Sequence, residues 1–173
     1  MEKKEFLEKV ETELKILKSS PNTIKSYVRS NNDFLNFIEK FPELITEEDL
    51  KKYLAKISEK SPISIIVFLA AIKFSFSNIL KRDLTSGIKR PKKEKKLPSV
   101  LSKEEVKRLI DSIKNKKSKL MLSLTYACGF RVSELVNLKI INLDLENLSG
   151  KISLGKGKKD RFFNIPSNLS KKI

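Results

Sequence analysis

The chain has 173 residues, and its 37 Lys and Arg side chains exceed its 21 Asp and Glu side chains by 16. It contains no His, no Trp and a single Cys, which excludes an internal disulfide framework, a zinc site built on His and Cys, and His-based acid–base catalysis by these residues. We therefore expect no metal and no other cofactor. Because no apolar run approaches the roughly 18–20 residues of a membrane span and the first residues do not resemble a signal peptide, we expect a cytoplasmic protein without a membrane partner.

Apolar residues at helical spacing predict four helices in the N-terminal part of the chain. The expected segments are residues 3–18, 21–41, 47–57 and 63–80. Ser20 and Thr46 are suitable N-caps for the second and third helices. The length of the fourth segment favours a buried helix, although its first residues alone would be assigned to a strand. Four helices with short connections predict a small all-α domain over residues 1–88.

Residues 89–100 (KRPKKEKKLPSV) are expected to be a basic linker, because they hold two prolines and show no apolar periodicity. The second domain, residues 101–173, begins with a helix at the capping-box pair Ser102 and Glu105. Four apolar residues of this helix are expected to point inward: Val106, Leu109, Ile110 and Ile113.

The rest of the second domain mixes helices with a β-hairpin. A helix from Lys119 is expected to end at Gly129, a short helix to follow over residues 131–138, and a further helix to begin at Ser167. Residues 151–154 and 161–165 predict two strands around a polar, Gly-containing turn. The expected fold is therefore mainly α, with a four-helix domain followed by an incomplete α+β domain.

The excess positive charge is concentrated outside the first domain. Residues 1–88 carry a net charge of +2, residues 89–100 of +5 and residues 101–173 of +9. Concentrated Lys attracts polyanions through counterion release, whereas a membrane-surface helix would carry exposed aromatic residues opposite its basic face. The densest basic run has no apolar face, so nucleic acid is favoured as the partner over a membrane or a merely Lys-rich surface.

The first motif that carries chemistry is YACGFRVSELVNL, residues 126–138. Arg131 follows a Gly-Phe turn and begins a short helix, so the backbone would aim its guanidinium fork at two oxygens of one phosphate. Glu134 lies on the same helical face and would orient or partly neutralise Arg131. The alternative, an exposed i,i+3 ion pair worth roughly a few tenths of a kcal/mol, is equally compatible with the spacing.

The second motif is GKGKKDR, residues 155–161, in the expected hairpin turn. Lys156 stands between two glycines and has little steric cover, so it could reach a phosphate or donate a proton to a leaving oxygen. The alternative is a solvated basic hairpin, which is the commoner explanation of a Lys-rich turn. The glycine spacing excludes a nucleotide triphosphate-binding loop.

In combination, these motifs resemble the tyrosine recombinase (phage integrase) family, and within it the Xer-type recombinases. Four segments carry the resemblance in the family's order, namely SPNTIKSY (20–27), KLPSVLSKEEV (96–106), CGFRVSEL (128–135) and GKGKKDR (155–161). The first is similar to the start of the family's SAM-like N-terminal core-binding domain, and the second to the linker entering its catalytic domain. The third and fourth are similar to the boxes that carry the family's first catalytic arginine and its catalytic lysine.

The resemblance implies a two-domain clamp around double-stranded DNA that cuts one strand with a tyrosine and rejoins it through a 3′-phosphotyrosine, without metal or nucleotide. In this interpretation Arg131 stabilises the charge of the phosphorane, Lys156 protonates the departing 5′ oxygen, and Glu134 supports Arg131. Residues 63–80 carry one Lys where the family usually has several basic residues, so phosphate contacts of the first domain are expected elsewhere. The expected DNA-contacting residues are Lys25, Arg29, Lys158, Lys159 and Arg161, although two solvated surface charges would also explain the first pair.

The resemblance also implies a His-x-x-Arg motif, a further His or Trp and a nucleophilic tyrosine after the hairpin. The chain has no His and no Trp, and its tyrosines are Tyr27, Tyr53 and Tyr126, at positions typical of core or half-buried aromatic residues. We therefore expect a C-terminally truncated recombinase that binds DNA but is inactive alone, and that meets further copies or an intact recombinase on DNA. The alternative is a decayed recombinase that acts as a DNA-binding or regulatory module.

Overall fold

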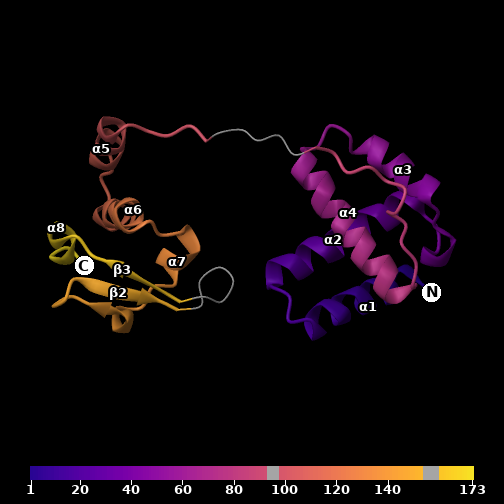
Figure 1. Cartoon of the computed structure of the whole chain (residues 1–173), viewed down its shortest axis with the longest axis horizontal. Coiled ribbons are helices and arrows are strands. Elements are labelled where there is room, and N and C mark those ends of the chain that lie inside the picture. Colours follow the sequence, from indigo (N-terminus) through magenta and orange to yellow (C-terminus); the bar gives the residue numbers. More distant parts are fainter. Residues whose placement is uncertain (93–97, 154–159) are drawn as a thin grey trace. The chain divides into compact units, whose positions relative to one another are not determined.

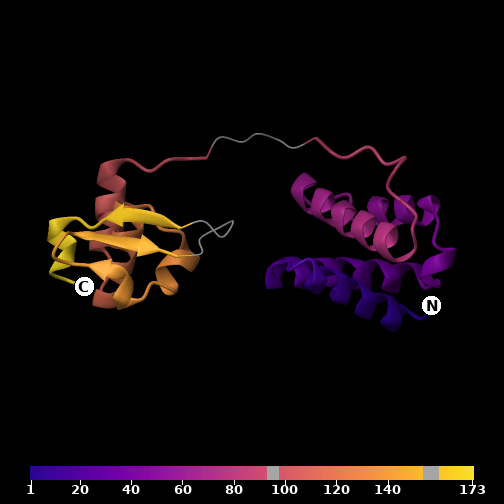
Figure 2. The same ribbon diagram turned by 60° about the horizontal axis from the view of Figure 1, so that its bottom comes forward.

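The computed structural model describes residues 1–92, 98–153 and 160–173. The chain divides into two compact units, Met1–Leu97 and Pro98–Ile173 (Figures 1 and 2). The N-terminal unit contains α1 (Lys3–Ile16), α2 (Pro21–Ile38), the 3₁₀ helix η1 (Pro42–Leu44), α3 (Glu47–Lys56) and α4 (Pro62–Ile79). The C-terminal unit contains α5 (Lys103–Asp111), α6 (Lys116–Cys128), α7 (Val132–Val136), the 3₁₀ helix η2 (Ile140–Asn142), β1 (Leu143–Asp144), β2 (Ser149–Ile152), β3 (Arg161–Asn164) and α8 (Ser167–Ser170).

Side-chain caps begin α2 and α3 where the sequence predicts them. The Ser20 hydroxyl accepts a hydrogen bond from the Thr23 amide, and Thr46 forms a capping box with Asp49. These caps satisfy amide groups that have no partner within the helix. The helix α2 ends earlier than expected, because Glu39 adopts a left-handed φ of 53° and stops it at Ile38.

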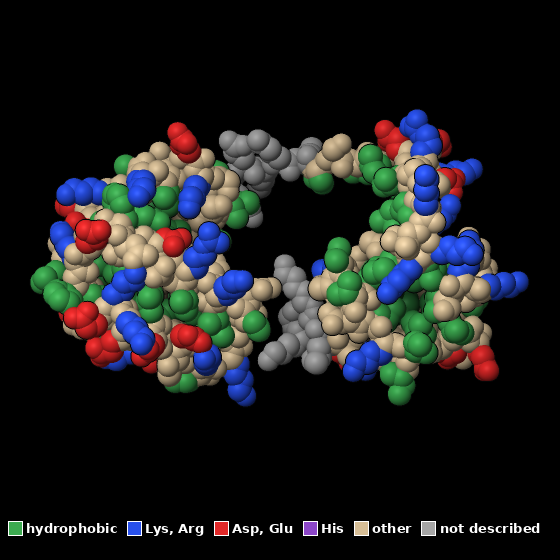
Figure 3. Space-filling view, turned by 180° about the vertical axis from the view of Figure 1, so that it is seen from behind, with side chains coloured by type: hydrophobic (Ala, Val, Ile, Leu, Met, Phe, Trp, Pro, Cys, Tyr) green, Lys and Arg blue, Asp and Glu red, His purple; other side chains and the backbone are tan. Residues whose placement is uncertain are grey.

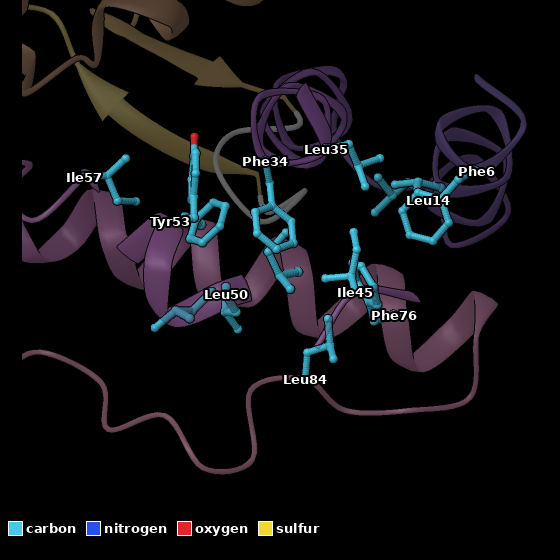
Figure 4. Close-up of a cluster of buried hydrophobic side chains, with 14 residues drawn as sticks. Phe6, Leu14, Phe34, Leu35, Ile45, Leu50, Tyr53, Ile57, Phe76 and Leu84 are labelled. Carbon is cyan, nitrogen blue, oxygen red and sulfur yellow. The ribbon is translucent and has the colours of Figure 1, made fainter. Parts of the chain in front are cut away.

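The core of the N-terminal unit is built around the fully buried ring of Phe34 (Figure 4). The rings of Tyr53, Phe68 and Phe76 surround it, with centroid distances of 5.4, 5.9 and 6.4 Å. These residues come from α2, α3 and α4, so the aromatic cluster joins three of the four helices. Such offset or edge-to-face pairs add stabilisation beyond the burial of their area.

The expectation that no segment reaches the length of a membrane span is wrong on length and hydropathy. Among the described residues, the 18-residue helix α4 is long and apolar enough to cross a membrane, with a mean hydropathy of 1.7. One third of it is buried, and that part includes Phe68, Ile72 and Phe76 of the unit's own core. Core helices of water-soluble proteins can be equally long and apolar. The buried part of α4 lies in such a core.

The helices of the C-terminal unit begin close to where they are predicted. Ser102 and Glu105 form the expected capping box of α5, while α6 begins three residues earlier than predicted, after the cap Asn115. The expected inward packing of α5 is corrected: although α5 lies wholly within the described residues, none of its side chains is fully buried, and Leu109 is 48% exposed.

A three-stranded antiparallel sheet in the order β1-β2-β3 forms the other side of this unit. The strands β2 and β3 are the predicted pair, and Gly150 lies opposite Phe163 in their register. The two-residue strand β1 was not predicted, because it is too short to show alternation. The second core joins the sheet to α6, α8 and the turn before α7, and its buried residues are Leu124, Phe130, Ile152, Phe163, Ile165 and Leu169.

Both units carry Lys and Arg side chains, but Asp and Glu side chains nearly balance them only in the N-terminal unit. On the face shown in Figure 3, Lys and Arg side chains lie among many Asp and Glu side chains over the N-terminal unit, which is on the left in that view. This mixture agrees with the small net charge of residues 1–88. Electrostatic attraction of a polyanion by this unit must therefore come from local groups of cations rather than from its total charge.

We predict that Gly150→Ala selectively destabilises the C-terminal unit. A Cβ atom at Gly150 would lie 2.4 Å from the Phe163 ring and 2.9 Å from the Asn142 carbonyl oxygen, so the ring or the backbone must move, at a cost of about 1–3 kcal/mol. Urea unfolding followed by amide NMR should show a lower midpoint for residues 98–173 and an unchanged one for residues 1–88. Ser149→Ala is the control, and equal losses in both units would contradict the prediction.

Candidate functional site

A tight turn between α6 and α7 sets the position of Arg131. Gly129 ends α6 with a left-handed φ of 62°, and the amides of Gly129 and Phe130 donate to the Thr125 carbonyl. A Cβ atom at Gly129 would meet nothing within 4 Å, so the backbone conformation rather than lack of space favours glycine. The buried ring of Phe130 packs edge-on against Phe163 at 4.6 Å. The turn is therefore anchored in the core immediately before Arg131.

Arg131 is the residue that precedes the first turn of α7, and Glu134 folds back onto it. One carboxylate oxygen of Glu134 accepts from the Arg131 main-chain amide at 3.0 Å, and the other accepts from the Arg131 guanidinium at 2.5 Å. The Glu134 side chain is 4% exposed, whereas that of Arg131 is 58% exposed. A guanidinium has five N–H donors, so the exposed remainder of this one can bind an anion while Glu134 holds its orientation.

Arg161, the first residue of β3, is a second partner of the same carboxylate. Its guanidinium donates to Glu134 at 2.8 Å and to the carbonyl oxygens of Gly129 at 3.1 Å and Cys128 at 3.5 Å. It also lies 5.6 Å from the centre of the Phe130 ring. Arg161 thus connects the sheet to the last carbonyl groups of α6 and to Glu134.

The two arginines change the acidity of Glu134. The hydrogen bond from Arg161, followed by those from the Arg131 amide and guanidinium, lowers the pKa of Glu134 from 4.5 to about 2. Glu134 therefore stays ionised over the whole physiological range, and the group of Glu134, Arg131 and Arg161 carries a net charge of +1. That surplus charge is available to an anionic ligand.

A hollow opens beside this cluster and is lined by further cations. Lys139 and Lys151 contribute to its wall together with Arg131, and Ser133 and Asn137 supply polar groups. The ammonium group of Lys151 also pairs with Asp160 at 2.8 Å. Cationic and hydrogen-bond-donating side chains around one depression are suited to a phosphate group.

The structure places the other predicted site residues as follows. Lys25 and Arg29 lie on α2 of the N-terminal unit, where both line a groove against α1, and Arg29 pairs with Asp33 at 3.7 Å. Lys156, Lys158 and Lys159 lie outside the described residues.

One expectation about side-chain burial near the site is corrected. Tyr126 on α6 was expected in a core or half-buried position, but it is 57% exposed. Cys128 is half-buried, and its thiol donates to the Asn164 carbonyl at 3.3 Å. Desolvation raises the pKa of this thiol, which keeps it protonated and unreactive at neutral pH.

The contact between Arg161 and Glu134 could not be predicted from the sequence, and neither could the positions of Lys139 and Lys151 around the same hollow as Arg131. These residues lie 8 to 30 positions from Arg131 in the chain, and no helical or strand period brings them to it. The one available signal was the presence of Arg161 in the second motif.

We predict that Glu134 titrates near pH 2 and that Arg161→Gln moves this midpoint upward, because the largest cause of the low pKa is removed. Since the folded-state pKa lies below the ordinary 4.5, ionised Glu134 stabilises the unit above about pH 4.5, and this contribution is lost as the pH falls through about 2. Carbon-13 NMR of the Glu134 carboxyl group measures the midpoint. Lys151→Gln is the control, and a midpoint that Arg161→Gln leaves unchanged would contradict the assignment.

Two family models match the chain. The model described as "Phage integrase, N-terminal SAM-like domain" matches residues 6–86, and the model described as "Phage integrase family" matches residues 99–173. Together they cover both units of the structure.

Relatives and solved structures agree with these matches. Tyrosine recombinase XerA of Pyrococcus furiosus is 36% identical, with 98% of this chain and 59% of the relative covered. A tyrosine recombinase of Pseudothermotoga lettingae is also 36% identical, with 89% of this chain and 58% of the relative covered. The chain thus spans little more than half the length of these relatives.

Among solved structures, the XerH site-specific recombinase bound to its difH substrate superimposes with a TM-score of 0.66 at 24% identity, over 95% of this chain and 53% of that one. The Tn1549 transposon integrase in complex with transposon right end DNA gives a TM-score of 0.66 at 15% identity, over 96% of this chain and 62% of that one. At these identities, the two structures establish the similarity of the fold.

Proposed function

The chain belongs to the phage integrase family of tyrosine recombinases, and on that premise we propose that it is the DNA-binding, arginine-bearing part of an Xer-like site-specific recombinase. The observation that carries this proposal is the geometry of Arg131, whose exposed guanidinium is oriented by a buried carboxylate beside a cationic hollow. Two proteins of similar fold, XerH bound to its difH substrate and the Tn1549 integrase in complex with transposon right end DNA, support DNA as the partner, which we propose is double-stranded. We further propose residues 1–88 as the core-binding domain, residues 89–100 as the linker and residues 101–173 as the first part of the catalytic domain.

In the proposed reaction Arg131 acts on the phosphate at which a strand is cut. Phosphoryl transfer is accelerated mainly by fixed positive charge and in-line positioning, because charge spreads over the phosphate oxygens in the transition state. A guanidinium that Glu134 already holds needs little reorganisation when the phosphate arrives. Glu134 therefore supports the catalytic group without contacting the phosphate.

Arg161 is proposed as a positioning residue rather than a DNA contact. Its hydrogen bonds go to Glu134 and to the carbonyl groups of Cys128 and Gly129, and its side chain is 35% exposed. These contacts hold the turn from which Arg131 projects. In the sequence motif, Arg161 was grouped with Lys158 and Lys159 as an expected DNA contact because the three residues are close together in the chain.

Lys156 is proposed as the proton donor to the departing 5′ oxygen, as the family resemblance implies. Support comes from the described residues on either side of its segment. Ser153 lines the hollow at Arg131, and Arg161 bonds to Glu134, so described residues on both sides of the segment lie at this site. Lys158 and Lys159 of the same segment, and Lys25 and Arg29 on α2, are proposed as phosphate contacts.

We predict that the chain binds duplex DNA with a steep salt dependence. If on the order of six phosphates are contacted, affinity should fall about a thousandfold between about 50 and 200 mM salt, because condensed counterions are released on binding. Fluorescence anisotropy with a short duplex measures this dependence. Affinity that barely changes with salt would contradict the proposal.

The same titration tests Arg131 itself. Removing one phosphate contact by Arg131→Ala should reduce the slope of log affinity against log salt by about 0.9. The matched control is Lys171→Ala, an exposed cation just after α8, at the end of the sheet opposite α7 (Figures 1 and 2). An unchanged slope for Arg131→Ala together with a reduced slope for Lys171→Ala would place the phosphate contact elsewhere.

The alternative role, a DNA-binding or regulatory module without chemistry, is distinguished by mixing the chain with full-length XerA of Pyrococcus furiosus. A module that only occupies sites should change strand transfer equally with or without Arg131, once DNA affinities are matched. A part that enters the reaction should affect strand transfer differently when Arg131 is replaced by Ala. No effect of either protein on strand transfer would argue against both roles in a shared complex.

A further inference from the structure

The outward face of α4 is apolar in its N-terminal half. Ile63 and Val67, one helical turn apart and called the aliphatic pair below, are 53% and 39% exposed. Ile66 and Ala70 extend the same face and are half-buried. Within the described residues, all four stand outside the hydrophobic core cluster of this unit. Folding of the unit therefore does not explain why this face is apolar.

The helix α2 lies beside this face and adds hydroxyl groups and charge. Ser26, Arg29 and Ser30 of α2 line one groove together with the aliphatic pair. Lys60, two residues before α4, and Ser64 in the first turn of α4 also line this groove. The remaining apolar lining comes from the buried side chains of Tyr53, Ile57 and Phe68. The groove thus combines exposed aliphatic carbon, short hydroxyl side chains and cations.

We propose that this groove reads the DNA major groove by packing the aliphatic pair against the C5-methyl groups of thymine, an inference that rests on the proposed DNA-binding function. In the major groove, thymine presents a methyl group that the other three bases lack, and apolar side chains contact it. The major groove is also wide enough to admit an α-helix. Arg29 and Lys60, at the rim, contact phosphates and fix the register, while the aliphatic pair selects the base.

The composition of the groove favours DNA over a protein partner. Protein interfaces are enriched in aromatic residues and Met and are depleted of Ser and Lys. The exposed residues here are aliphatic, hydroxyl-bearing and cationic, and the two aromatic residues in the lining, Tyr53 and Phe68, are buried. Asp33, a carboxylate that lines the groove, is paired with Arg29 at 3.7 Å, which limits its repulsion of phosphate. A membrane-spanning position of α4 is disfavoured, because the helix supplies Phe68, Ile72 and Phe76 to the core of this unit.

The test compares two duplexes that differ in this methyl group alone. The full chain is titrated with a short alternating dA·dT duplex and with the same duplex carrying uracil in place of thymine. Phosphate charge and Watson–Crick pairing are the same in both duplexes. We expect the thymine duplex to bind about fourfold more tightly for each methyl group buried, and on the order of tenfold for two.

Two variants connect this preference with the aliphatic pair. Ile63→Ala combined with Val67→Ala should bring the thymine-to-uracil affinity ratio close to one. Both residues are exposed and lie outside the core cluster, so the variant should keep the fold, which circular dichroism checks. The matched control is Ile16→Ala combined with Leu17→Ala, which removes side chains that are 67% and 61% exposed at the end of α1. The control should retain the ratio. Methyl NMR should also show cross-peaks between the aliphatic pair and thymine methyl protons.

Each other outcome overturns the inference in a distinguishable way. Equal affinity of the wild-type chain for both duplexes excludes thymine reading while leaving DNA binding intact. A preference that survives in the Ile63→Ala, Val67→Ala variant assigns thymine reading to other residues. Sedimentation that shows a dimer dissolved by this variant would assign the face to a second copy of the chain. Binding to neither duplex at low salt would remove the proposed function itself.

Discussion

The buried carboxylate of Glu134 is the contact on which the candidate site depends. It accepts hydrogen bonds from the Arg131 amide, the Arg131 guanidinium and Arg161, so it joins the start of α7 to the sheet. A buried charge is tolerated only when it is paired and hydrogen-bonded. Removal of one partner leaves the remaining charge buried and unpaired, at the full cost of its desolvation. The orientation of Arg131 is therefore linked to the packing of the whole C-terminal unit.

The Phe130 and Phe163 pair supplies the apolar part of the same arrangement. Phe130 precedes Arg131 in the turn, and Phe163 lies two residues after Arg161 in β3, so the two rings and the two arginines connect the same two elements. The rings exclude water from one side of the cluster, which strengthens the hydrogen bonds to Glu134. The packing of these rings and the orientation of Arg131 therefore depend on each other.

In the N-terminal unit, the two faces of the helix α4 have different surroundings. The inner face of α4 supplies Phe68, Ile72 and Phe76 to the core, and Ser75 accepts a hydrogen bond from the buried amide of Asn31 on α2 at 2.8 Å. This buried polar link restricts the register of the two helices. The exposed residues Ile63 and Val67 take no part in this core, so α4 is apolar on its outward face as well as on its inner face.

The sequence by itself determined the features that depend on near neighbours in the chain. Caps at Ser20, Thr46 and Ser102, the glycine end of α6 and the i,i+3 pair of Arg131 and Glu134 follow from local spacing, because the atoms concerned are separated by one helical turn or less. The burial of Glu134, its second arginine and the cations around the hollow were decided by the tertiary structure alone. Their positions follow from how β2 and β3 pair and pack against α6 and α7, and contacts between residues far apart in the chain leave no periodic pattern in the sequence.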